Sequence, residues 1–177
     1  MSPLAFYESG VVEVVIPTDI ISVSEYAFYN SKNLTNIKLS EGLEFIETGS
    51  FYGCTKLYGV SIPKSVQKVN RGAFGRCVSL EKIELKGLST NVSESIFEYQ
   101  DSELFPSAYH SHSATMGCFT EVIDLDYTPD VESFKCITIV VPKSTKNKYT
   151  FKPIQHLNWS HDEMDRRFQI LENDEDC

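Results

Sequence analysis

The sequence predicts a mainly β solenoid, in which 23-residue turns stack through a parallel sheet. Two observations predict this fold. Apolar residues recur every 23 residues without a slip, and an aromatic residue recurs at the same interval inside each copy. A fixed period of this length indicates turns that cannot bury their own apolar face and must stack on their neighbours. The columns include Ile16, Leu39, Ile62 and Leu85, then Leu34, Leu57 and Leu80, and the aromatics Phe28, Phe51 and Phe74.

The composition fits one globular domain over residues 1–177 and excludes two classes of partner. Apolar residues make up 41% and charged residues 23% of the chain, which is ordinary for such a domain. The net charge of −9 argues against binding to nucleic acid and to anionic membranes, since both favour clustered Lys and Arg. No apolar run approaches the roughly 20 residues of a membrane helix, so we expect no membrane insertion.

The chain opens inside a turn. Ala5-Phe6 precedes Val11 at nearly the spacing that Ala27-Phe28 shows before Leu34, with one residue fewer. Repeat arrays generally need terminal caps, and no polar capping segment precedes this half-turn. Two explanations compete: the chain is a piece of a longer array, which we favour, or the half-turn is itself the cap. An open N-terminal end would also allow self-association.

Each full turn between Val11 and Leu85 is expected to contain the same elements. In Thr35 to Leu39 the apolar residues occupy alternate positions, which predicts a half-buried strand. Pro63 ends the corresponding strand of the next copy, because proline has no N–H for a ladder. The strand is followed by a second short extended piece, then by the buried aromatic residue, and then by a tight corner. Stacking then places equivalent strands about 4.8 Å apart, with each Phe over the next.

This pattern resembles the BspA-like leucine-rich repeats, which occur on surface proteins of anaerobic bacteria and some protists. The resemblance covers roughly residues 10–97 and 119–160. It implies a leucine-rich repeat solenoid, a role in adhesion or protein recognition, and an extracellular or cell-surface location with a host or extracellular protein as partner. The first full turn departs from the pattern with Ser31 in place of Cys. The matching residues are Ile62, Pro63, Val66, Val69, Ala73, Phe74, Cys77, Leu80, Ile83 and Leu85.

The repeat register fails after Phe97 and returns in altered form. We therefore divide the domain into repeats at 1–97, a polar insertion at 98–117, an altered closing repeat at 118–142 and a C-terminal cap at 143–177. Cys136 to Pro142 is the strongest predicted strand of the closing repeat. With the later Trp159, it resembles the closing segment of the same family.

The C-terminal cap is expected to contain a short helix. Ser160 and Glu163 have the spacing of a capping box. Met164, Phe168 and Leu171 then lie on one helical face. We expect this helix to give way near Phe168, although Phe168 to Glu172 would also fit a final extended piece.

The five cysteines do not indicate a disulfide framework or a zinc site. Cys54 and Cys77 occupy one column on adjacent turns, so their Cα atoms lie about 4.8 Å apart. Parallel side chains leave the Cβ atoms beyond the usual disulfide value of roughly 3.8 Å, and we expect free buried thiols. Cys118, Cys136 and Cys177 show no Cys-x-x-Cys spacing.

No catalytic motif stands out, so we predict a protein that is not an enzyme and needs no cofactor. His110 and His112 in the insertion are the residues of the alternative, a metal-binding or enzymatic protein. A third alternative is a cytoplasmic repeat scaffold.

Binding is expected on the outward side of the strands and in the insertion. If Ile37 and Leu39 point inward, their neighbours point outward, and repeat solenoids commonly bind along such a face. Aromatic residues are favoured at interface hot spots, and we expect Tyr29, Tyr52 and Tyr58 to be exposed. The candidate partner-binding residues are Glu13, Asn36, Lys38, Ser61, Lys82 and Glu84 on the strands, and Tyr99 and Tyr109 in the insertion.

Overall fold

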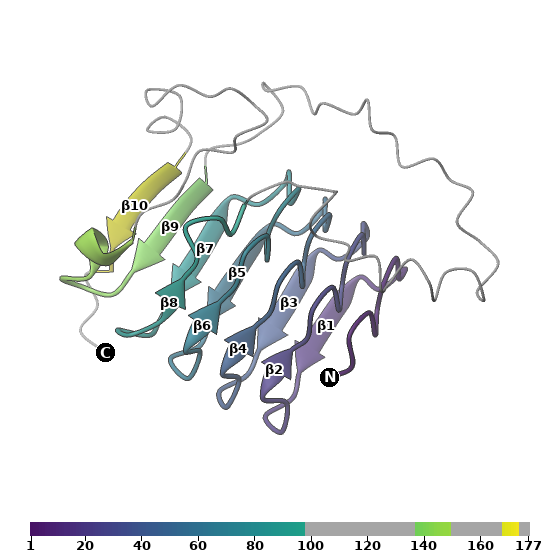
Figure 1. Ribbon diagram of the computed structural model, residues 1–177. Helices are drawn as coiled ribbons and strands as arrows, with labels where there is room; N and C mark the ends of the chain where they lie inside the picture. The colour runs from purple at the N-terminus through teal and green to yellow at the C-terminus, as the bar shows by residue number, and fades with distance from the viewer. Residues whose placement is uncertain (98–136, 150–167, 174–177) are drawn as a thin grey trace.

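The computed structural model describes residues 1–97, 137–149 and 168–173. These residues form a solenoid with two parallel sheets along its length, which Figure 1 shows as two rows of strands. The larger sheet has the order β1 (Glu13–Ile16), β3 (Asn36–Leu39), β5 (Gly59–Ile62), β7 (Lys82–Leu85), β9 (Ile137–Val141) and β10 (Phe168–Glu172). The smaller sheet has the order β2 (Ser22–Val23), β4 (Phe45–Ile46), β6 (Lys68–Val69) and β8 (Asn91–Val92).

The 23-residue register of the sequence is the register of the larger sheet. Glu13 pairs with Asn36, Asn36 with Gly59, and Gly59 with Lys82. The sheet then continues across the insertion, since Lys82 pairs with Thr138 of β9. The predicted mainly β solenoid with stacked parallel strands is therefore confirmed.

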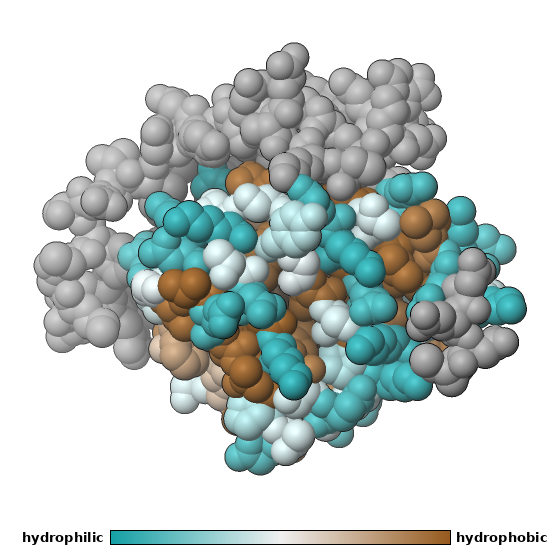
Figure 2. All heavy atoms as spheres, turned by 180° about the vertical axis from the view of Figure 1, so that it is seen from behind, coloured by the Kyte–Doolittle hydropathy of each residue, from teal (hydrophilic) through white to brown (hydrophobic). Residues whose placement is uncertain are grey.

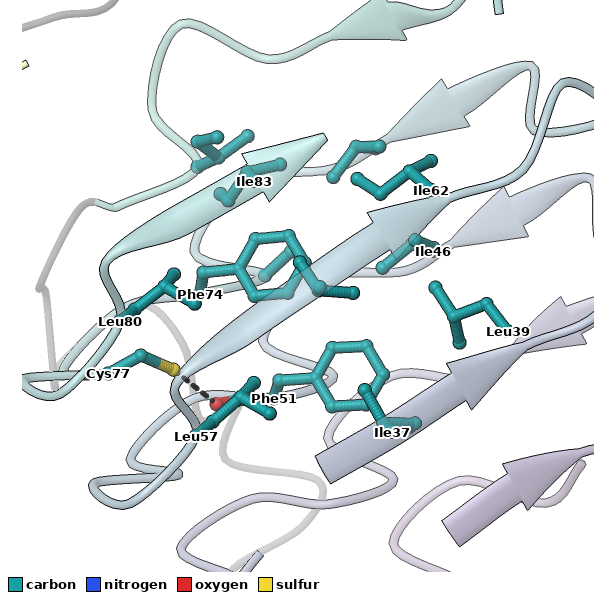
Figure 3. Packing of buried hydrophobic residues seen from close by; sticks show 14 of the residues in the cluster. Ile37, Leu39, Ile46, Phe51, Leu57, Ile62, Phe74, Cys77, Leu80 and Ile83 are labelled. Carbon is teal, nitrogen blue, oxygen red and sulfur yellow. Dashed lines mark hydrogen bonds between the residues drawn. The ribbon is translucent and has the colours of Figure 1, made fainter. Parts of the chain in front are cut away.

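A ladder of phenylalanine rings runs through the core. The Phe28 and Phe51 rings stack with centroids 5.4 Å apart, and Phe51 and Phe74 with centroids 5.5 Å apart. Phe6 extends the ladder, with its ring centroid 4.9 Å from that of Phe28. Leucines and isoleucines of the neighbouring columns fill the space around the rings (Figure 3). The half-turn at the start of the chain thus packs as the sequence predicts.

A second aromatic ladder lies outside the main core and corrects one expectation. The expectation that Tyr29 and Tyr52 are exposed is wrong, because both side chains are buried. Their rings stack at 5.0 Å, and the Tyr7 ring stacks on Tyr29 at 5.4 Å. Each tyrosine follows the core phenylalanine of its turn, so the same 23-residue stacking orders both ladders. Tyr58 is 58% exposed, as expected.

The C-terminal end of the larger sheet is a strand contributed by the predicted cap. Phe168–Glu172 is strand β10, paired in parallel with β9, so the final extended piece that the sequence allowed is confirmed, while the short helix expected before Phe168 lies outside the described residues. Pairing with the otherwise free edge of β9 satisfies backbone groups that a helix would leave exposed on the sheet. Among the described C-terminal residues, the helical structure is the 3-10 turn Lys146–Lys148. Met164, Ser160 and the insertion 98–117 lie outside the described residues, as does the part of 118–142 before β9.

The turn at Gly42 requires glycine, and this predicts a contrast with Gly59. Gly42 has φ +100°, and an added Cβ would lie 2.8 Å from the Thr18 carbonyl oxygen. Gly42→Ala should therefore lower the free energy of unfolding by about 1–3 kcal/mol. Gly59→Ala is the control, because its added Cβ would meet Lys82 at an ordinary 3.4 Å. Equal losses for the two variants in urea denaturation would contradict this interpretation.

Candidate functional site

The candidate site is the outward face of the larger sheet, where alternate strand residues form two rows across the turns. The first outward row contains Glu13, Asn36, Gly59 and Lys82. The second outward row contains Val15, Lys38, Ser61 and Glu84. The residues between them, such as Ile37, Val60 and Ile83, are buried in the core. The structure therefore brings the six strand candidates together on one face, as the alternation predicts.

The two rows differ in how far their side chains reach into solvent. Glu13, Asn36, Lys38 and Lys82 are exposed, whereas Glu84 is half-buried. The Ser61 hydroxyl donates a hydrogen bond to the Glu84 carboxylate at 2.9 Å, which links β5 to β7 on this face. The rows continue onto β9, where Thr138 lies beside Lys82 and Val140 beside Glu84.

The centre of the face is a gap that sequence reasoning did not single out. Gly59 is the one member of the first outward row without a side chain, and this missing side chain is the gap in the row. Tyr58 precedes it and is 58% exposed. Lys38 lies on the strand to one side of Gly59 and Lys82 on the strand to the other. The signal for this gap was present in the sequence, as a glycine in a column of longer side chains.

The insertion candidates cannot be assigned to this face. Tyr99, Tyr109, His110 and His112 lie outside the described residues. Within the described residues, no group of three or more His, Cys, Asp and Glu side chains is arranged to hold a metal ion.

The residues at the tight corner of successive turns form a buried column that stabilises the stacking of the turns. Cys54 and Cys77 are free thiols, as predicted. The Cys54 thiol donates to the Phe28 carbonyl oxygen at 3.2 Å, and the Cys77 thiol to the Phe51 carbonyl oxygen at 3.1 Å (Figure 3). Ser31 makes the same bond to Phe6 at 2.6 Å, which explains why serine replaces cysteine there.

Burial keeps these two thiols protonated. It raises the pKa of Cys54 to about 12 and the pKa of Cys77 well above its ordinary value. The thiolate is the nucleophilic form of cysteine, so neither residue is suited to catalysis. Cys118, Cys136 and Cys177 lie outside the described residues.

In the part of the chain that the structure describes, no helix has the length and apolar character needed to cross a membrane.

Several solved structures of leucine-rich repeat proteins are similar to this chain. The chain is similar to a leucine-rich repeat protein of T. pallidum at 30% identity, over 51% of this chain and 42% of that chain, with a TM-score of 0.49. It is also similar to a leucine-rich repeat protein from Bacteroides capillosus at 32% identity, over 48% of this chain and 61% of that chain, with a TM-score of 0.45. A third similar structure is a leucine rich cell surface protein from Faecalibacterium prausnitzii, at 25% identity over 52% of this chain and 22% of that chain, with a TM-score of 0.41. In each case, the match spans less than two thirds of the other protein.

A search of curated proteins found no match. The family model described as BspA type Leucine rich repeat region matches residues 1–121 in 6 copies. This match includes the half-turn around Phe6 and every turn whose strands form the two outward rows before β9. The chain therefore belongs to the BspA-type leucine-rich repeat family.

Proposed function

We propose that this chain is a non-catalytic protein-binding or adhesion module, which recognises its partner on the outward face of the larger sheet. The observation that carries the proposal is the alternation of buried and exposed residues along each strand. Inward residues such as Ile37 and Ile83 form the core, while Lys38 and Lys82 beside them face solvent. Outward residues are therefore free to serve recognition without a cost in packing.

The chemistry of the face suits a protein partner. It combines carboxylate, ammonium, amide, hydroxyl, aromatic and aliphatic groups, and it has no single sign of charge. In the view from behind, hydrophilic and hydrophobic side chains of the described residues are interspersed over the surface (Figure 2). Protein interfaces have this mixed character, whereas a nucleic-acid surface would be strongly basic.

The gap at Gly59 is the proposed centre of recognition. The exposed Tyr58 ring beside it offers a large contact area with one polar end, which is typical of hot spots. The Lys38 and Lys82 side chains are both exposed, so their ammonium groups can reach a partner's carboxylates or carbonyl oxygens. An extended segment lying across the strands would fill the gap and meet both lysines.

A cell-surface or secreted location is part of the proposal. Proteins of the BspA-type family are often found on cell surfaces, and adhesion would use the same solvent-facing strands. The buried thiols fit such a location as well as a reducing one, because protonated and enclosed sulfurs resist oxidation.

The proposal can be tested with a displayed library of random peptides. Peptides that bind the full chain are selected first, and their binding to variants is then measured. Peptides selected in this way should lose binding by about thirtyfold or more to Tyr58→Ala, because hot-spot truncation costs about 2 kcal/mol or more. Lys82→Glu should also weaken the binding of those selected peptides that are acidic. The matched control is Lys64→Glu, which changes the same charge at an exposed position away from the two outward rows.

Equal binding of the selected peptides to wild type, Tyr58→Ala and Lys82→Glu would contradict the proposal. The variants' circular dichroism and melting temperature should match those of the wild type, because both positions are exposed.

A further inference from the structure

A cluster of lysines lies beyond the C-terminal ends of β7 and β9. One lysine directly follows β7, and three more follow β9 within the segment 143–148. All four side chains are exposed. Because β7 and β9 are neighbours in the larger sheet (Figure 1), the two segments leave the sheet side by side. The four residues are Lys86, Lys143, Lys146 and Lys148.

Hydrogen bonds join the segments that carry these lysines. The Lys148 ammonium group donates to the Leu88 carbonyl oxygen at 3.3 Å, which connects the 3-10 turn to the β7–β8 connection. The Lys146 backbone N–H donates to the Glu172 carboxylate at 3.1 Å, which connects the same turn to β10. The fold therefore brings together lysines that lie about 60 residues apart in the sequence.

Leu88 is an exposed apolar residue within this cluster, with a side chain that is 61% exposed. The earlier turns have no apolar side chain at its place, where they carry Asp19, Gly42 and Ser65. Lys86 departs from its column as well, because the earlier turns have no charge there and carry Pro17, Ser40 and Pro63. Stacking requires neither change, since both side chains are exposed to solvent.

The cluster is locally positive, although the chain has a net charge of −9. Charges more than about 8 Å apart are largely screened at physiological ionic strength, so the lysines dominate the potential close to them. Two carboxylates border the cluster and both already accept hydrogen bonds, Glu172 from the Lys146 backbone N–H and Glu84 from the Ser61 hydroxyl. We infer that the four lysines and Leu88 form a second binding site, the lysine patch, for an acidic segment of another protein that places an apolar side chain on Leu88.

Leu88 favours a protein segment over other anionic occupants. A sulfated glycan would supply negative charge but no apolar side chain. The chain's own acidic residues Asp174, Glu175 and Asp176 have the same shortcoming. An anionic membrane would need an apolar face wide enough to enter it, whereas Leu88 is the single large apolar side chain of the patch. An acidic peptide with one leucine or phenylalanine matches both the charge and the apolar contact.

Labelled synthetic peptides and the full chain test the inference. The probe is a short peptide of glutamates around one central leucine. One control peptide replaces the glutamates with lysines, and a second replaces the leucine with serine. Fluorescence anisotropy should show the probe binding at least about tenfold more tightly than the lysine control. It should bind about threefold or more tightly than the serine control, because serine removes the apolar contact.

Variants of the chain show whether the probe binds at the patch. Lys86→Gln with Lys146→Gln should weaken the probe about fivefold, since exposed charge pairs contribute modestly. Leu88→Ser should weaken it about threefold or more. The matched control is Lys32→Gln with Lys56→Gln, which removes the same charge from exposed positions before β3 and β5 and should leave binding unchanged. All these positions are exposed, so melting temperatures should match the wild type.

The patch is separate from the outward rows around Gly59, so Tyr58→Ala should also leave the affinity for the probe unchanged. A loss in Tyr58→Ala that Lys86→Gln with Lys146→Gln does not share would overturn the inference. Equal binding of the probe and the lysine control would overturn it, and so would full affinity in Leu88→Ser. Binding of heparin or of phosphatidylserine vesicles without binding of the probe would overturn it too. The same holds for a probe that binds only after Asp174, Glu175 and Asp176 are neutralised, because the occupant would then be this chain's own acidic segment.

Discussion

Replacing Phe51 with alanine is expected to lower the free energy of unfolding by about 3–5 kcal/mol. The Phe51 ring is fully buried and stacks between Phe28 at 5.4 Å and Phe74 at 5.5 Å. Its loss opens a cavity in the middle of the ladder and removes two ring contacts. In a solenoid, each turn depends on its neighbours, so a central defect separates the turns on either side. Urea denaturation followed by circular dichroism measures the change.

Phe6→Ala is the matched control for this prediction. It removes the same side chain from the same ladder, but at the end, where the ring is 38% exposed and has one described ring partner. Its cost should be less than half that of Phe51→Ala. A loss of under about 1 kcal/mol for Phe51→Ala would contradict the stacked arrangement.

Raising the pH to about 11 is expected to destabilise the protein by about 2–3 kcal/mol through the buried thiol of Cys54, and the Cys77 thiol acts in the same direction. Burial raises the pKa of Cys54 from 9.0 to about 12 and that of Cys77 in the same direction. A raised folded-state pKa gives stability that is complete below the unfolded pKa and is lost as pH rises through the folded value. The loss therefore begins near pH 9 and continues toward pH 12.

The double variant Cys54→Ser, Cys77→Ser isolates this effect from the titration of tyrosines. Ser31 already shows that a hydroxyl in this column donates to the carbonyl oxygen of the preceding turn. The variant should be within about 1–2 kcal/mol of the wild type at pH 7, and its stability should fall less steeply between pH 9 and about 11. If the stability of the two proteins falls equally between pH 9 and about 11, ionisation of the thiols is not the cause of the stability lost at alkaline pH.

The sequence was most informative where one physical rule acts alone. A side chain in a stacked turn meets its counterpart 23 residues away, so the Phe28, Phe51 and Phe74 columns became ladders as predicted. The strand alternation likewise placed Lys38 and Lys82 outward. These features follow from local geometry repeated at a fixed interval.

Features that depend on competing contacts were harder to predict. Phe168–Glu172 fits both a helical spacing from Met164 and a final extended piece, and its pairing with the edge of β9 makes it a strand. Tyr29 and Tyr52 lie in a corner that follows neither a strand nor a helix period, so alternation gave no indication of their burial. Their recurrence 23 residues apart was the available signal, and it identifies them as a second ladder.

The candidate site was predictable in position and less so in detail. Alternation placed the rows, while the importance of Gly59 depends on its register between Asn36 and Lys82. Partner chemistry depends on these arrangements, which the repeat pattern does not determine.

An alanine scan of β3, β5 and β7 tests the central claim most directly, because it measures stability and peptide binding in the same variants. Inward variants Ile37→Ala and Ile83→Ala should each lose about 2–5 kcal/mol of unfolding free energy. Outward variants Lys38→Ala and Lys82→Ala should stay within about 0.5 kcal/mol of the wild type and weaken binding of the selected peptides. Outward variants that destabilise the fold as much as inward ones, or that leave peptide binding unchanged, would contradict the division of each strand into a core side and a recognition side.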